Sequence, residues 1–116
     1  MAILRNGKAQ FSCIAIVDTG SVLSLFDAQI GKVLGLDVTS GSQKKLSSLG
    51  GSLTGYSHSI ELSIDIGDGT ELTVGTMEVL FSDRSISRSI LGRSGFFSLL
   101  KIGISERNQQ LFVEPE

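Results

Sequence analysis

One carboxylate stands out as a group that could do chemistry. Asp18 follows the apolar run 14–17 and precedes Thr19, Gly20 and Ser21. Backbone N–H groups and hydroxyls of this kind can hold a charged carboxylate without a neutralising cation. The glycine also lets other backbone approach closely. The pattern therefore predicts a carboxylate at the end of a buried strand, available for general acid–base chemistry.

Other common catalytic groups are scarce. Cys13 is the single cysteine and His58 the single histidine. A thiolate metal cluster is therefore excluded, and a Ser-His-Asp triad or a histidine metal site would have to be built around His58 alone. Cys13 lies in an apolar run, which favours core packing, and His58 begins an alternating segment, which favours the surface. We expect no metal and no organic cofactor.

The elements that must position Asp18 are mostly strands. Residues 59–66 alternate without a fault, and their apolar members share one face: Ile60, Leu62, Ile64 and Ile66. Gly-Asp-Gly at 67–69 predicts a hairpin turn, and Asn-Gly at 6–7 predicts another. In the strand that follows the turn at 67–69, the alternation of apolar and polar residues shifts by one position at 75–76, which predicts a β-bulge.

Helix is expected only in short pieces. Residues 27–34 predict one, with Asp27 as its N-cap and Gly35 ending it, and residues 94–100 predict another. Many short segments separated by glycine turns are typical of a small closed or sandwich-like all-β domain. We expect residues 1–116 to form a single domain.

Length and charge narrow the function further. The chain has 116 residues, of which 41% are hydrophobic, as in an ordinary globular domain. With a formal net charge of -2, the chain lacks the excess of basic residues that is typical of nucleic-acid-binding proteins. No apolar run approaches the roughly 20 residues that span a bilayer, so we expect no membrane contact by this segment. The start lacks the pattern of a secretory signal, which favours the cytoplasm unless the chain is part of a longer protein.

Three segments together resemble one known family. They are Ile-Val-Asp-Thr-Gly-Ser at 16–21, Leu-Gly-Gly at 49–51 and Ile-Leu-Gly-Arg at 90–93. Their order and spacing resemble the retropepsin-like aspartic proteases, the single-lobe relatives of pepsin. The resemblance implies an all-β, closed β-barrel monomer with one or two short helices, working as a two-fold dimer. It implies an aspartic endopeptidase that acts on polypeptide substrates.

The resemblance also implies a role for each matching residue. Asp18 would be the catalytic aspartate, and Thr19 would hydrogen-bond across the dimer. Gly20 would let the substrate backbone approach, within a loop that Ser21 helps to support. The tip of a mobile flap would consist of Leu49, Gly50 and Gly51.

A further segment would back the active-site loop: Ile90, Leu91, Gly92 and Arg93. Here the chain departs from the viral pattern, in which an acidic residue follows the catalytic loop and pairs with this arginine. Val22 and Leu23 stand in that place. Asp27 is a possible substitute partner for Arg93.

A single Asp-Thr-Gly motif sets a requirement on assembly. In this chemistry two carboxylates share a proton, because like charges at close range cannot both ionise. The second carboxylate must therefore come from a second copy across a two-fold axis, which predicts a homodimer. Residues 100–104 and 110–113 predict a C-terminal hairpin that supplies most of the interface sheet. Its candidate contributors are Ile102, Ile104, Leu111 and Val113.

Two alternatives stay open at this point. The same fold could serve as a non-catalytic dimerisation or peptide-binding module, because a fold does not guarantee a function. The C-terminal hairpin could also pack only on the barrel of its own subunit.

Overall fold

The computed structural model of the protein describes residues 1–48 and 51–115. Strands dominate this part of the chain, with a single α-helix, α1 (Ala28–Val33), and two 3₁₀ turns, η1 (Val38–Ser40) and η2 (Phe97–Leu99). The strands are β1 (Ala2–Asn6), β2 (Ala9–Cys13), β3 (Ala15–Val17), β4 (Leu25–Phe26), β5 (Ser42–Ser48), β6 (Gly51–Asp65), β7 (Glu71–Ser82), β8 (Ser89–Leu91), β9 (Leu100–Ser105) and β10 (Gln110–Pro115).

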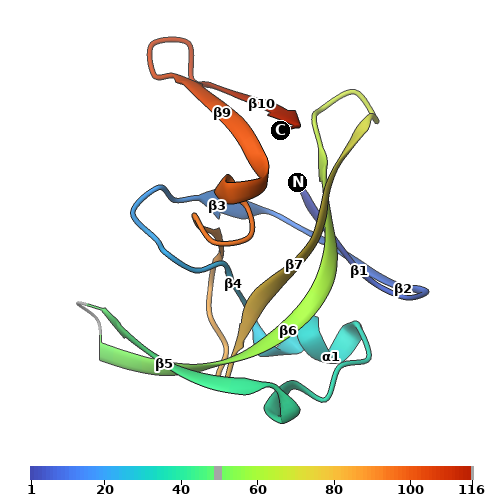
Figure 1. Ribbon diagram of the computed structural model, residues 1–116, viewed down its shortest axis with the longest axis vertical. Helices are drawn as coiled ribbons and strands as arrows, with labels where there is room; N and C mark the ends of the chain where they lie inside the picture. Colours follow the sequence, from blue (N-terminus) through green and yellow to red (C-terminus); the bar gives the residue numbers. More distant parts are fainter. Residues whose placement is uncertain (49–50, 116) are drawn as a thin grey trace.

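Eight of these strands form one strongly curved sheet. Its order is β2-β1-β6-β7-β4-β8-β3, and β5 pairs with β6 outside this path. The two ends of the path, β2 and β3, follow each other in the sequence and are separated only by Ile14. The sheet therefore curls into a nearly closed barrel, and the β9–β10 hairpin forms a separate two-stranded sheet (Figure 1).

The hairpin turns of this sheet lie where the sequence predicts them. Gly7, with φ +60°, connects β1 to β2, and Gly67 and Gly69 connect β6 to β7. Both predicted hairpins are thereby confirmed. The predicted bulge is also present in β7, but Val74 is its extra residue, so it lies next to the predicted position 75–76.

The core fills the inside of the barrel. Its largest fully buried side chains are aromatic: Phe26, Phe81 and Phe96. The α1 helix begins as predicted, with the Asp27 carboxylate accepting the Gln29 N–H at 3.0 Å. The second predicted helix, at 94–100, is only the turn η2. Gly95 interrupts it, because its φ of +91° is incompatible with a right-handed helix.

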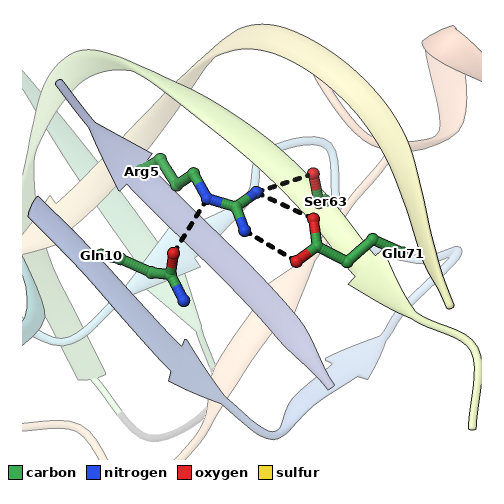
Figure 2. A network of polar contacts seen from close by, with 4 residues as sticks. All are labelled: Arg5, Gln10, Ser63 and Glu71. Atoms are coloured by element: carbon green, nitrogen blue, oxygen red, sulfur yellow. Dashed lines mark hydrogen bonds and ion pairs between the residues drawn. The ribbon is translucent and has the colours of Figure 1, made fainter. Parts of the chain in front are cut away.

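A polar network ties four strands together (Figure 2). The Arg5 guanidinium on β1 donates to both carboxylate oxygens of Glu71, at 3.0 and 2.7 Å. It also donates to Gln10 at 3.0 Å and to Ser63 at 3.3 Å. These hydrogen bonds lower the pKa of the Glu71 carboxyl and raise that of Arg5. The network links β1 to β2, β6 and β7 at their surface.

The lone cysteine and the lone histidine both contact buried side chains of the barrel. Cys13 is half-buried against the core, and burial raises the pKa of its thiol. His58 was expected at the surface, but it is half-buried. Its Nε2 lies 2.7 Å from the Val38 carbonyl oxygen, and its ring meets Phe81 edge-on. The adjoining η1 turn covers it, which alternation along one strand does not reveal.

Two classes of feature are absent from the described part of the chain. No helix there is both long and apolar enough to cross a membrane. No group of three or more His, Cys, Asp or Glu side chains in residues 1–48 and 51–115 could hold a metal ion.

Candidate active site

The loop after β3 holds Asp18 in a defined position. The Asp18 N–H donates to the Leu91 carbonyl at 2.9 Å, which anchors the residue to β8. One carboxylate oxygen accepts the Gly20 N–H at 2.9 Å, and the Ser21 N–H donates to the Asp18 carbonyl at 3.2 Å. No cation of the described residues pairs with this half-buried carboxylate. The carboxylate is held by the backbone of its own loop, through the Gly20 N–H.

The neighbouring hydroxyls differ in their surroundings. The Ser21 hydroxyl donates to the Leu23 carbonyl at 2.7 Å and so closes the loop on itself. Thr19 is exposed, and its hydroxyl has no hydrogen-bond partner within the described part of this single chain. The predicted contact of Thr19 across a dimer stays a prediction.

The segment at 90–93 lies directly behind this loop. β8 runs parallel to β3, with Ile16 opposite Ile90 and Val17 opposite Leu91. Leu91 is buried in the core. Gly92 has no room for a side chain, because a Cβ there would lie 2.4 Å from the Leu23 carbonyl oxygen. The sequence therefore needs glycine at 92 so that the active-site loop can rest on β8.

Ser24 is a supporting residue that sequence reasoning missed. It is only 1% exposed. Its hydroxyl accepts the Gly92 N–H at 3.0 Å and donates to the Ser94 carbonyl at 3.3 Å. It thus joins the loop at 18–24 to the segment after β8. The only signal was a hydroxyl between two leucines, which is too common to single out.

The proposed pairing of Arg93 with Asp27 is wrong. The two Asp27 carboxylate oxygens accept the N–H groups of Gln29 and Ile86, at 3.0 and 2.8 Å. Asp27 is thereby committed to capping α1 and holding the loop before β8. The Arg93 side chain is exposed and forms no ion pair with any described residue. Its backbone N–H donates to the Ser21 carbonyl at 2.9 Å.

The predicted flap coincides with a long hairpin. We call β5 and residues 51–57 of β6 the flap hairpin, in which Leu46 pairs with Leu53 and Ser48 with Gly51. Gly51 opens β6 with φ +118°. The other two predicted tip residues, Leu49 and Gly50, lie outside the described residues.

A cavity joins the active-site loop to the flap hairpin. Its volume is about 400 Å³, and most of its lining side chains are apolar. The lining residues are Gly20, Ser21, Val22, Leu23, Leu25, Leu46, Ser47, Leu53 and Ile90. No charged side chain lines it, so the cavity is suited to an uncharged side chain of a ligand that reaches Gly20.

A family model described as aspartyl protease matches residues 4–94. This match covers most of the chain, including the loop at Asp18 and the segment at 90–93. The chain belongs to the aspartyl protease family. No curated protein sequence matches this aspartyl protease.

Solved structures resemble this aspartyl protease in fold. One is EIAV protease in complex with the inhibitor HBY-793, with a TM-score of 0.50 and 18% sequence identity. The match covers 79% of this chain and 77% of the EIAV chain. The predicted fold class is thereby confirmed: a mostly β, nearly closed, retropepsin-like barrel with one short helix.

Proposed function

We propose that the protein is an aspartic endopeptidase that works as a two-fold homodimer. Two Asp18 carboxylates, one from each subunit, share a proton. The ionised one takes a proton from water, which attacks the scissile carbonyl carbon. The protonated one polarises the carbonyl oxygen and then protonates the leaving amine. The peptide C–N bond breaks, and the water is divided between the two products.

The observation that carries this proposal is the setting of Asp18. Its carboxylate is held by the Gly20 N–H, without a cation, beside an apolar cavity between its own loop and the flap hairpin. A structural carboxylate would more simply be paired or capping, as Asp27 is. Membership of the aspartyl protease family supports the same reaction.

A second copy is required because the sequence contains a single Asp-Thr-Gly motif and this chemistry needs two such carboxylates. The surface that supports a dimer is the β9–β10 hairpin, whose strands pair only with each other among the described residues. Its Ile102 and Val113 pack against the core of their own barrel. Ile104 and Leu111, directly opposite each other, are 60% and 41% exposed.

The exposed end of this hairpin adjoins the active-site strand. Val17, which precedes Asp18, lines a groove together with Ile104 and Leu111. Phe112, on the other face of the hairpin, is 55% exposed. A partner that covers these apolar side chains would lie next to Asp18, as a shared catalytic pair requires.

The direct test is proteolysis of an unfolded protein substrate across pH. We expect the wild type to cleave it and Asp18→Asn to reduce cleavage at least about 10³-fold, because half of the carboxylate pair is lost in each subunit. Circular dichroism and sedimentation should show that the variant remains a folded dimer. Binding of peptides without cleavage by the wild type would favour the non-catalytic module instead.

A further inference from the structure

The flap hairpin has an inner and an outer face that can be assigned residue by residue. Leu46 and Leu53 are opposite each other and both line the cavity, so their side chains mark the inner face. Gly55, two residues beyond Leu53, shares that face. A Cβ at Gly55 would lie 3.1 Å from the Cβ of Leu80, so this face of the hairpin continues onto the face of β7 that carries the buried Leu80.

Two adjacent lysines of β5 lie on opposite faces of this hairpin. Lys44 is opposite Gly55 and two residues from Leu46, so it projects from the inner face. Lys45 is opposite Thr54 and projects from the outer face. Both lysines are exposed. Glycine at 55 leaves no cross-strand side chain beside Lys44.

The charge of Lys44 is not neutralised within the described chain. Neither lysine forms an ion pair there. The cavity beside Leu46, two residues from Lys44 in β5, has no charged side chain in its lining. Glu78 accepts a hydrogen bond from Ser57 further along the hairpin. The inner face therefore combines an apolar cavity, at Leu46 and Leu53, with an unpaired cation, Lys44, two residues from Leu46.

We infer that Lys44 selects peptide substrates that carry a carboxylate side chain near the scissile bond. This inference rests on the proposed endopeptidase function. An extended peptide under the flap hairpin would place an apolar side chain in the cavity beside Leu46. A Glu or Asp two residues further along would meet Lys44, because alternate residues of an extended chain and of β5 both repeat at about 7 Å. In a two-fold dimer this preference applies on both sides of the scissile bond.

The experiment measures kcat/KM for a matched set of peptides. A short unstructured peptide that the wild type cleaves at an apolar residue is varied at each flanking position to Glu, Gln or Lys. At the position two residues from the apolar side chain in the cavity, on each side of the scissile bond, we expect the Glu peptide to be cleaved about threefold to fivefold better than the Gln peptide, as for an exposed charge pair. Lys should be cleaved worst. The ratio should fall towards one as salt is raised to about 1 M.

Variants of the two lysines assign the preference. Lys44→Gln should abolish the difference between Glu and Gln peptides, and Lys44→Glu should reverse it in favour of Lys. Lys45→Gln is the matched control, since it removes the same charge from the same strand but from the outer face. It should leave the ratio unchanged. Cleavage of the Gln peptide should persist in all three variants.

Three outcomes would contradict the inference. One is equal cleavage of Glu and Gln peptides by the wild type. Another is an equal loss of the ratio in Lys45→Gln, which would point to the overall charge of the flap hairpin. The third is a preference that survives in Lys44→Gln and disappears in Arg93→Gln. If no peptide is cleaved, the proposed function itself fails, and the two failures are thereby distinguished.

Discussion

At the scale of single residues, the position of Asp18 depends on atoms behind it that do no chemistry. The loop at 18–24 rests on the bare backbone of Gly92 and is tied to it by the buried Ser24 hydroxyl. The orientation of Asp18 relative to the cavity therefore depends on a glycine and a serine.

Gly92→Ala tests this support. The added methyl group would meet the Leu23 carbonyl oxygen at 2.4 Å. The loop must then shift, and we expect the free energy of unfolding to fall by about 1–3 kcal/mol, as for other overpacked sites. Chemical denaturation measures the change. Gly103→Ala is the control, because a Cβ there meets Phe112 atoms at an ordinary 3.7 Å or more. Equal stability of the two variants would show that the loop does not rest on Gly92.

The same residues show how far the sequence could predict the site. The hydrogen bond from the Gly20 N–H to the Asp18 carboxylate was predictable, because it joins residues that are neighbours in the sequence. Glycine at 92 was singled out by its motif, and a Cβ there would lie 2.4 Å from the Leu23 carbonyl oxygen. The partners of Arg93 and the role of Ser24 were not predictable. Asp27 was a plausible partner by charge, but its carboxylate is taken by two backbone N–H groups that come from different parts of the chain.

At the scale of elements, local chemistry determined what could be predicted. The hairpin turns at Gly7 and at 67–69 and the N-cap at Asp27 depend only on neighbouring residues, and all three are present. The segment at 94–100 failed as a helix because Gly95 adopts a left-handed φ against Met77, a contact far away in the sequence. The order of strands in the barrel likewise depends on pairings that no local pattern encodes.

The β9–β10 hairpin provides a prediction at this scale. Removing it whole would also uncover the barrel, because Ile102 and Val113 pack against the core. A change of the exposed Leu111 alone is therefore the cleaner test. We expect Leu111→Asp to weaken dimerisation at least about tenfold by placing a charge in each half of an apolar interface.

Sedimentation at several concentrations measures this effect, and activity per subunit should fall with it. Val33→Asp is the matched control, since Val33 is an exposed apolar residue of α1, at 52%, but lies outside the hairpin. A dimer that tolerates Leu111→Asp as well as it tolerates Val33→Asp would place the interface elsewhere.

At the scale of the whole molecule, the proposed function makes the single-chain barrel half of a catalytic unit. Its exposed apolar side chains include Ile16 and Val22, which flank Asp18 in the sequence, and Ile104 and Leu111 on the β9–β10 hairpin. The groove from Val17 to Leu111 connects the two regions. A homodimer with its axis beside Asp18 would cover both and complete the carboxylate pair.

The measurement that tests this account most directly is proteolysis by mixtures of wild type and Asp18→Asn at constant total protein. If each active site takes one Asp18 from each subunit, only wild-type pairs are fully active. Activity then follows the square of the wild-type fraction, and an equal mixture retains about one quarter of full activity. The two proteins must first be allowed to exchange subunits. Activity in simple proportion to the wild-type fraction would contradict the account, because each chain would then cleave peptides with a site of its own.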